Sequence, residues 1–243
     1  MRRFTAAALA AICVLAAACG GNNSSAPAAS SAKSGASSST SSTPPPPVAV
    51  SALDGLLLSA AQINTAMGAT GITVTKTQEQ MEDTSASVHD SACVFAGAPA
   101  DTSDYAGSGW SAVRGQRLED AANLAQDKYL VLPYVVLFPS AGQAAAFFTA
   151  SSQQRWPACS NRQYTAAAAE NQSITITWDV SPVSNTDGTL SLTQTEERTN
   201  GWACQRALAV RNNVVIDVSA CSFNLADSAV KITNQIAAKV PKE

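Results

Sequence analysis

The chain has few of the residues that metal sites, nucleic-acid interfaces and most acid–base catalysts use. Among 243 residues there is one histidine, and only 14% of the residues are charged. The 15 lysines and arginines form no cluster and the formal net charge is −3, which argues against nucleic acid and polybasic lipid binding. No Cys-x-x-Cys pair occurs, so a zinc site is not expected. The sequence predicts no metal and no cofactor.

The motifs of the common enzyme classes are also missing. No Gly-x-Ser-x-Gly elbow, P-loop or dinucleotide fingerprint is present. Residues 228–231 match the Ser-x-x-Lys of penicillin-recognising enzymes, but Lys-Thr-Gly is absent and Ser222-Phe223-Asn224 lies upstream instead of downstream. A catalytic triad would need His89, for which a surface role is expected. Glu196 and Glu197 are adjacent and therefore lie on opposite faces of a strand, so they cannot act as an acid–base pair. We expect that the protein is not an enzyme.

The longest apolar run lies at the N-terminus and predicts export. Two arginines precede Phe4–Ala18, which ends at Cys19. A charged start and a short apolar segment are typical of a secretory signal, too short to span a membrane comfortably. Leu-Ala-Ala-Ala before Cys19 resembles a bacterial lipoprotein signal, although Ala16 stands where that family prefers leucine. We expect removal of residues 1–18 and a palmitate-type anchor on Cys19, facing the extracytoplasmic side; an ordinary secreted protein is the alternative.

The segment after the signal predicts a tether. Gly20–Pro47 consists of Ser, Ala, Gly, Thr, Pro and Asn, with Lys33 as its only charge. Such a composition cannot bury enough apolar surface to offset the entropy of ordering. We therefore expect residues 19–47 to be a lipidated cysteine followed by a disordered linker. Residues 48–243 are enough for a single domain with its own core.

Cysteine spacing predicts two disulfides in that domain. An even four cysteines remain after Cys13 and Cys19, namely Cys93, Cys159, Cys204 and Cys221. Asn212 and Asn213 separate two β-like runs, a pattern typical of a tight hairpin turn. In the register of this turn Cys204 lies opposite Cys221 at a non-hydrogen-bonded pair, where α-carbons approach to about 4.5 Å, close enough for a disulfide. Cys93–Cys159 then follows as the second bridge.

The same register divides the hairpin side chains between two faces. One face is apolar and expected to pack on the core: Ala207, Ala209, Val214, Ile216 and Val218. The other carries Cys204, Leu208 and Ser219, with Arg206 and Asp217 as diagonal neighbours that can pair. We expect this second face to be open to solvent. Arg206 would form either a solvated ion pair or a contact to an anionic or polar ligand.

Patterns along the rest of the domain predict an α+β fold. Ser59–Gln62 is a capping box that opens a helix, and Gly68 ends it. Further helices are expected over residues 139–155 and after Asp227, and strands over 72–77, 110–118, 129–138, 174–180 and 189–195. Pro133 limits the third of these strands to a sheet edge or a bulge. The expected architecture is an antiparallel sheet packed with a few helices on one face and braced by two disulfides.

Four segments together resemble the PknH-like extracellular sensor domain of a mycobacterial serine/threonine kinase and its stand-alone lipoprotein relatives. They are LLLSAAQINTAMGATGITVT, YAGSGWSAVRGQ, VVLFPSAGQAAAFFTASSQQRWPAC and GWACQRALAVRNNVVIDVSAC. The likeness runs from about Leu53 to Val240, with the four cysteines in the same order. It implies first-to-second and third-to-fourth disulfides, an α+β fold with an open cleft for an unidentified ligand, and extracytoplasmic sensing. The sequence departs from that kinase in having no kinase domain and no membrane span.

Two aromatic residues supply candidate ligand contacts. Tyr105 and Trp110 flank flexible glycines, a composition suited to a recognition loop, and core packing is the alternative for both. Arg206 is the third candidate, whereas Trp156 and Trp202 are expected to pack against disulfides. We hypothesise a sensor that binds a small or cell-envelope ligand. The alternatives are a carrier of lipids or glycolipids in an apolar cavity, a cell-wall hydrolase or transferase, and docking to an envelope protein such as a kinase.

Overall fold

A computed structural model of the chain describes residues 45–120, 128–168 and 171–241. The predicted signal, the lipid attachment at Cys19 and the tether up to residue 44 lie outside the described residues. The described part begins with Pro45 and leads directly into the folded domain.

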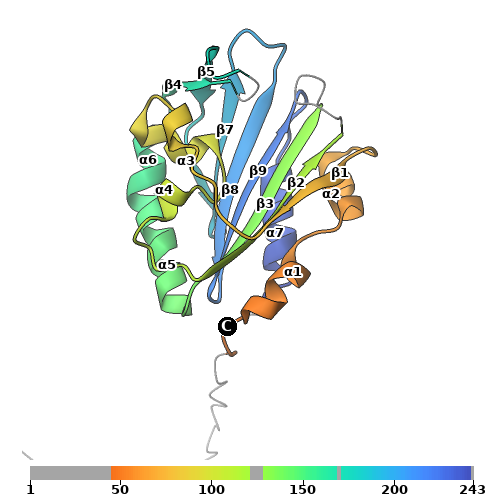
Figure 1. The fold of residues 1–243 in the computed structure, drawn as a ribbon, viewed down its shortest axis with the longest axis vertical. Coiled ribbons are helices and arrows are strands. Elements are labelled where there is room, and N and C mark those ends of the chain that lie inside the picture. The colour runs from red at the N-terminus through yellow and green to blue at the C-terminus, as the bar shows by residue number, and fades with distance from the viewer. Residues whose placement is uncertain (1–44, 121–127, 169–170, 242–243) are drawn as a thin grey trace, which may run out of the picture. The chain divides into compact units, whose positions relative to one another are not determined.

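The described residues form a nine-stranded antiparallel sheet in the order β1-β2-β3-β9-β8-β7-β5-β4, with β6 paired to β7 (Figure 1). The strands are β1 (Thr73–Gln78), β2 (Ala112–Glu119), β3 (Tyr129–Leu137), β4 (Gln163–Ala167), β5 (Thr175–Val180), β6 (Ser184–Thr186), β7 (Thr189–Glu196), β8 (Ala203–Arg211) and β9 (Val214–Ser222). All five predicted strands are present, with ends shifted by one or two residues. The turn that joins β6 to β7 is Asp187-Gly188, where both residues hold a positive φ.

Helices cover both faces of this sheet. They are α1 (Leu53–Leu56), α2 (Ala60–Met67), α3 (Val94–Gly97), α4 (Thr102–Tyr105), α5 (Ala141–Ala150), α6 (Trp156–Cys159) and α7 (Ser228–Ala237), and the π-helix Ser151–Arg155 joins α5 to α6. A first core lies between the sheet and α3–α6, and a second core lies between the opposite face and α1, α2 and α7. In the described ranges no helix is long and apolar enough to cross a membrane.

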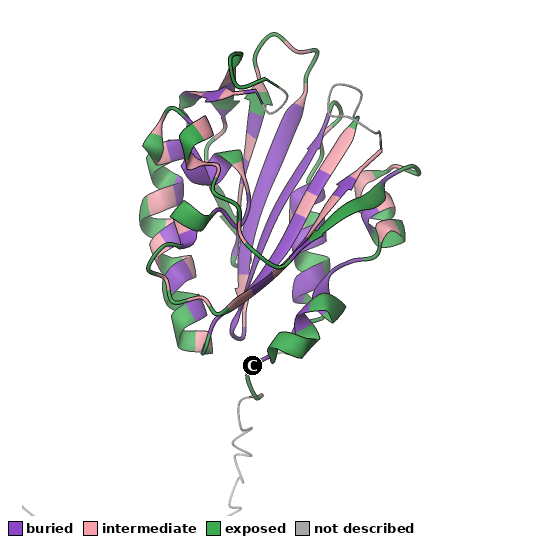
Figure 2. Cartoon of the chain, viewed as in Figure 1, coloured by how far each residue is buried: buried purple, intermediate pink, exposed green. Residues whose placement is uncertain are grey.

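The α+β class and the antiparallel sheet are confirmed, but the helices are not confined to one face. The reason is visible in the central strands, which are purple along their length in Figure 2. Every residue of β9 is buried, and in β8 only Val210 and Arg211 are not. A strand buried on both sides needs a cover on each face of the sheet. By contrast, five of the six residues of the edge strand β1 are exposed.

The predicted cysteine hairpin is confirmed in register and in its bridge. Cys204 pairs with Cys221, their α-carbons are 4.0 Å apart, and the disulfide is formed. The second bridge joins Cys93 to Cys159 across 66 residues. Asn212 takes the positive φ that the turn requires (49°).

The other turn asparagine fastens the start of the domain to the sheet. Asn213 accepts a hydrogen bond from the Val48 amide (2.7 Å) and donates to the carbonyl oxygens of Val48 (3.1 Å) and Phe138 (2.8 Å). The β8–β9 turn therefore also holds the first residues of the domain against the sheet.

The expectation for Pro133 is wrong. β3 is an interior strand between β2 and β9, and Pro133 pairs with Val218 of β9. On the β2 side, paired residues stop at Gly115–Tyr134 and resume at Leu118–Val131 without a change of register. Proline lacks the N–H that a ladder needs, so the sheet accommodates it by a local gap in one ladder instead of placing the strand at an edge.

The helix start signals are confirmed with one change. Ser59 and Gln62 form the capping box of α2, and Gly68 ends it with a φ of 66°. Asp227 is the N-cap residue of α7, yet its side chain makes no cap hydrogen bond. Instead, Gln205 of β8 accepts from the Ala229 amide (3.0 Å). A strand side chain therefore satisfies the first turn of the last helix.

Removing the two disulfides separately tests how each contributes to stability. The Cys204→Ala/Cys221→Ala double substitution should lower the free energy of unfolding by about 3 kcal/mol, because it frees a short loop of the unfolded chain. Cys93→Ala/Cys159→Ala should cost about 4 kcal/mol because its loop is longer. Urea unfolding under oxidising conditions measures both. A clearly larger loss for the shorter loop would contradict this entropic account.

Candidate functional site

Arg206 and Asp217 form the predicted ion pair, but deep inside the protein. Arg206 is 1% exposed and Asp217 is 3% exposed. Arg206 Nη2 lies 2.7 Å from Asp217 Oδ1, and Arg206 Nε donates to the carbonyl of Phe95 in α3 (3.1 Å). The expectation of an open sheet face is wrong because α3, α4 and α6 pack over it as part of the first core.

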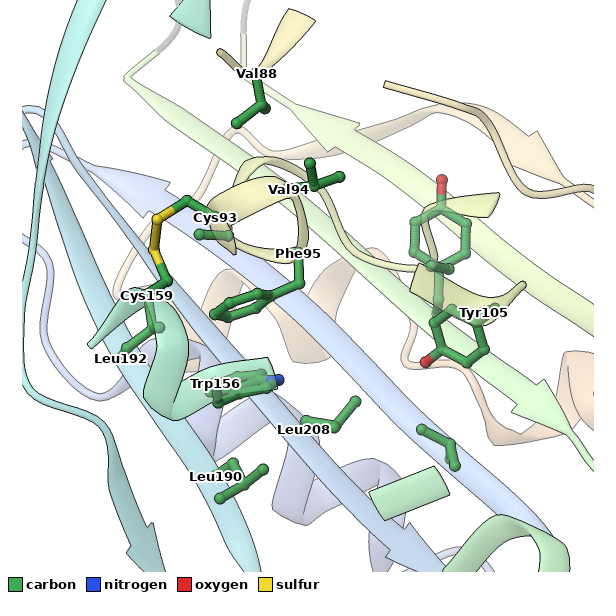
Figure 3. Close-up of a cluster of buried hydrophobic side chains, with 14 of the residues drawn as sticks. Val88, Cys93, Val94, Phe95, Tyr105, Trp156, Cys159, Leu190, Leu192 and Leu208 are labelled. Atoms are coloured by element: carbon green, nitrogen blue, oxygen red, sulfur yellow. A yellow bond between two sulfur atoms is a disulfide. The ribbon is translucent and has the colours of Figure 1, made fainter. Parts of the chain in front are cut away.

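Tyr105 belongs to the same cluster. It is 1% exposed, its hydroxyl donates to Asp217 Oδ2 (3.1 Å), and its ring stacks on Phe147 of α5 at 4.3 Å. Figure 3 shows Tyr105 to the right of Phe95 and Trp156, which belong to the same core. Burial and the Asp217 carboxylate raise the pKa of Tyr105 well above its ordinary value, so its hydroxyl remains a hydrogen-bond donor. Tyr105 thus follows the packing alternative and not the exposed loop.

A strained backbone position donates a second hydrogen bond to Asp217 Oδ2. The Ala100 amide donates to Asp217 Oδ2 (2.9 Å), and Ala100 holds a φ of 51° although it is buried. A positive φ is unfavourable for alanine. The contact with the buried carboxylate offsets this strain, because the carboxylate needs donors from every side once it has left water.

The π-helix brings a second arginine to the cluster. Arg155, its last residue, donates from Nη1 to the carbonyl oxygen of Asp104, and its guanidinium carbon lies 5.1 Å from the centre of the Phe147 ring. π-Helical turns insert an extra residue and are frequent at functional sites. We call Asp104, Tyr105, Arg155, Arg206 and Asp217 the polar centre.

Asp104 is the titrating member of the polar centre. Burial raises its pKa to about 7, with the charges of Asp217 and Asp101 acting in the same direction and those of Arg206 and Arg155 opposing them. Arg206 Nη1 is buried and has no hydrogen-bond partner among the described residues. Asp104, Arg155 and Arg206 line one small cavity of about 10 Å³. Arg206, whose Nη1 lacks a hydrogen-bond partner, and Asp104, whose pKa is about 7, therefore line the same small cavity.

A much larger groove lies elsewhere, beside the β8–β9 turn. It measures about 600 Å³. It is lined by Ala141 and Ala145 of α5, by Asn234 and Ala237 of α7, and by Asp187, Val210, Arg211, Asn212, Ala238 and Pro241. Its alanines come from α5 and from the end of α7, which cover opposite faces of the sheet, so the groove lies at the turn end of the β8–β9 hairpin. Its polar groups include a carboxylate, a guanidinium and two amides.

The sequence-predicted residues divide between these places. Tyr105 and Arg206 meet in the polar centre, whereas Trp110 is half-buried against the first core and lines neither the groove nor the small cavity. Trp156 is 2% exposed and stacks on Phe95 at 5.1 Å, next to the Cys93–Cys159 bridge in Figure 3. Trp202 packs edge-on against Phe223 (5.1 Å).

Sequence reasoning missed Asp104, Arg155 and the groove. The Asp-x-x-Asp pattern of residues 101–104 marks a helix start, and Asp101 does cap α4, but this pattern carries no information on the burial of Asp104. Arg155 lies in an expected helix, and nothing in the sequence indicates that its last turn is a π-helix that brings Arg155 to the carbonyl oxygen of Asp104. The groove is built from four separate segments.

The residues considered for catalysis lie apart from both sites. Ser228 is buried at the start of α7 and Lys231 is exposed. His89 is exposed, with Nδ1 3.1 Å from Thr165 Oγ1. Within the part of the chain that the structure describes, no three His, Cys, Asp or Glu side chains could hold a metal ion together.

The raised pKa of Asp104 predicts a pH-dependent stability. The folded chain binds the Asp104 proton up to a pH of about 7, whereas the unfolded chain releases it near its ordinary value of 3.8. Stability should therefore fall as pH rises through this interval. Asp104→Asn removes this cost, so at about pH 8 it should be on the order of 2 kcal/mol more stable than the unmodified protein, and nearly equal to it at about pH 4.

Urea unfolding at the two pH values measures this difference. Asp179→Asn, at an exposed carboxyl of β5, is the matched control and should change stability by less than about 0.5 kcal/mol at either pH. An unchanged pH slope in Asp104→Asn would show that Asp104 titrates as an ordinary surface carboxyl.

Comparison with known proteins identifies the family to which the described domain belongs. Residues 48–239 match the family described as the PknH-like extracellular domain. The chain is 32% identical over 196 residues to the serine/threonine-protein kinase PknH of Mycobacterium bovis and of Mycobacterium tuberculosis, a match that covers 81% of this chain but only 32% and 30% of those kinases. The crystal structure of the extracellular domain of PknH from Mycobacterium tuberculosis superimposes with a TM-score of 0.74 at 30% identity, covering 80% of this chain and 97% of that domain. The chain therefore belongs to the PknH-like extracellular domain family.

Proposed function

We propose that this chain is an extracytoplasmic sensor module, a lipoprotein held at the cell membrane through Cys19, which binds a small or cell-envelope ligand. The relatives support the extracellular part of this proposal, because the matched region is the extracellular domain of a kinase. Two disulfides support it too, since such bridges persist in oxidising compartments. The sequence pattern of residues 1–19, which resembles a lipoprotein signal, supports the anchor.

The groove beside the β8–β9 turn is the observation that carries the binding role. Its volume of about 600 Å³ lies within the range of small-molecule sites. Asp187 and Arg211 offer opposite charges, and Arg211 uses Nη1 for the carbonyl of its neighbour Val210 (2.7 Å). Asn212 and Asn234 add amide groups. A groove that combines two charged and two amide side chains with alanines suits a polar ligand better than an acyl chain, so we favour a sensor over a lipid or glycolipid carrier.

A signal sensed by this domain would reach the cell through another envelope protein. The kinases that share the domain are about three times as long as the matched region. We propose that the chain acts without catalysis of its own and that an envelope protein partner reads its ligand-bound state.

Blocking the groove tests the binding role. Ala145→Trp places an indole in the groove, whereas Ala146→Trp places it on the exposed face of the same helix outside the lining residues. Native mass spectrometry of the protein against an envelope extract should show a specific adduct that falls at least about tenfold in Ala145→Trp, a loss of about 1.4 kcal/mol, and persists in Ala146→Trp. Equal adducts in both variants would remove the groove from the proposal.

The same assay separates the groove from the sequence-based hypothesis. If Trp110 contacts the ligand, Trp110→Ala should weaken the adduct; if the ligand occupies the groove, Trp110→Ala should leave it intact. Lipid released from the adduct would identify a carrier instead of a sensor. Turnover of envelope material that is lost in Ser228→Ala would identify an enzyme.

The anchor is tested by substituting its attachment residue. Cys19→Ala should move the protein from the membrane fraction to the medium and abolish labelling by palmitate. Cys13→Ala, within the expected signal, should change neither result. A Cys19→Ala protein that stays palmitoylated and membrane-bound would contradict the proposed lipoprotein.

A further inference from the structure

We propose that the groove beside the β8–β9 turn binds a short peptide whose two termini are free, with the ammonium group at Asp187 and the carboxylate at Arg211. This inference rests on the groove as the ligand site proposed above and adds the chemical class of the ligand. Charges without a partner, the amides in the lining and the size of the groove support it.

Two opposite charges line the groove, and neither is paired inside the protein. Asp187 and Arg211 are the charged residues of the lining, and neither takes part in an ion pair between described residues. Yet they lie near each other, since a Cβ atom added to Gly188 would lie 3.9 Å from Arg211 Nη1. The groove therefore offers both a carboxylate and a guanidinium to a ligand.

This pair of charges selects among ligands by their charge. A ligand with only a negative group would be repelled by Asp187, and one with only a positive group would be repelled by Arg211. A neutral ligand would displace water from both charged groups and pair with neither. A ligand that carries an ammonium and a carboxylate pairs with both, so the lining favours a zwitterion.

The groove also holds a buried amide oxygen that lacks a partner. Asn212 lines the groove and is only 7% exposed. Its Nδ2 donates to the carbonyl oxygen of Pro46 (3.1 Å), and because a carbonyl oxygen only accepts, this bond fixes the orientation of the amide. Asn212 Oδ1 then has no hydrogen-bond partner among the described residues. A buried acceptor in this state favours a ligand that brings a donor, such as an ammonium group.

Free donors for a carboxylate lie in the same lining. Arg211 uses Nη1 for the carbonyl of Val210 (2.7 Å), which leaves its Nε and Nη2 for a ligand. Thr189 Oγ1 donates to Asn234 Oδ1 (3.1 Å), which leaves the Nδ2 group of Asn234. Hydrogen bonds from a guanidinium to a carboxylate are among the strong ones in proteins. The groove can therefore satisfy both ends of a zwitterion.

Two helix ends add electrostatic potentials of both signs. α5 begins and α7 ends at the end of the sheet where β8 turns into β9 (Figure 1), and Ala141 and Ala237, at these helix ends, line the groove. A helix start is positive and a helix end is negative. These fields support the selection that Asp187 and Arg211 make.

The volume favours a peptide over a single amino acid. A site of about 600 Å³ holds a drug-sized ligand, which is several times larger than one amino acid. The alanines of the lining offer apolar contacts without deep pockets: Ala141, Ala145, Ala237 and Ala238. We therefore expect a short peptide with small side chains.

Alanylalanine is the probe for the test, and its two blocked forms are the controls. N-acetylalanylalanine lacks the ammonium group, and alanylalaninamide lacks the carboxylate. The isotope-labelled protein is titrated with each peptide, and the side-chain amide signals of Asn212 and Asn234 are followed by NMR. We expect saturable shifts with alanylalanine and about fivefold weaker binding of each blocked form. Free alanine should also bind more weakly than the dipeptide, because it contacts less of the groove.

Two substitutions assign the two ends of the peptide. Asp187→Asn should weaken alanylalanine about fivefold and should not weaken N-acetylalanylalanine. The turn should persist, because asparagine tolerates the positive φ of this position (52°). Arg211→Gln should weaken alanylalanine about fivefold and should not weaken alanylalaninamide. If Arg211→Gln does not fold, Arg211→Lys keeps the charge and should retain binding of alanylalanine.

Matched controls remove one charge of each sign elsewhere. Asp179→Asn and Arg198→Gln change exposed residues outside the lining and should leave the affinity for alanylalanine unchanged. Equal binding of alanylalanine and both blocked forms would overturn the inference. Binding that neither Asp187→Asn nor Arg211→Gln weakens would overturn it as well.

Ala145→Trp separates this inference from the groove itself. It should abolish both the adduct from the envelope extract and the binding of alanylalanine. An adduct that is lost in Ala145→Trp, together with no binding of alanylalanine, would overturn the peptide and leave the groove as the ligand site. Binding of alanylalanine that is unchanged in Ala145→Trp would put the peptide outside the groove and overturn the inference.

Discussion

The double burial of the β8–β9 hairpin is the constraint on which the rest of the structure depends. All nine residues of β9 are buried, so each face of the hairpin must be covered by other elements. One face receives α1, α2 and α7, and the other receives α3–α6. The turn fastens the start of the domain through Asn213, and Cys204–Cys221 closes the opposite end. The hairpin therefore fixes both the entry of the chain and the two layers of helices.

Placing Arg206 and Asp217 in that hairpin has structural consequences beyond the strands. A buried ion pair stabilises a protein only if its remaining donors and acceptors are satisfied. Here α3 supplies the Phe95 carbonyl, α4 supplies the Tyr105 hydroxyl, and the segment between them supplies the Ala100 amide at an unfavourable φ. The covering segment is thus tied to the sheet by polar contacts that depend on charge.

The groove and the polar centre differ in size and in chemistry, since one is open and the other is nearly filled by side chains. The groove lies where two helices and a hairpin turn leave space, and its lining is dominated by small side chains. The polar centre is nearly filled, and its chemistry comes from desolvation: burial moves the pKa of Asp104 to about 7. Of these two sites in the described residues, the groove is the one with room for an organic molecule.

Residues close together in the chain determined the hairpin register, the Cys204–Cys221 bridge, the capped start of α2 and the antiparallel α+β class. The Cys93–Cys159 bridge followed from counting the cysteines that remained. Such local patterns could not decide what lies above a strand face. Arg206 looked solvated because its cover, Phe95 to Tyr105, lies 101 or more residues earlier, and Pro133 looked like an edge residue because only the assembled sheet shows that one ladder can skip it. Burial, pKa and cavities are properties of surfaces brought together from distant segments. The sequence therefore determined the hairpin frame and its two disulfides, whereas the tertiary structure alone decided which charged groups are buried and where the groove lies.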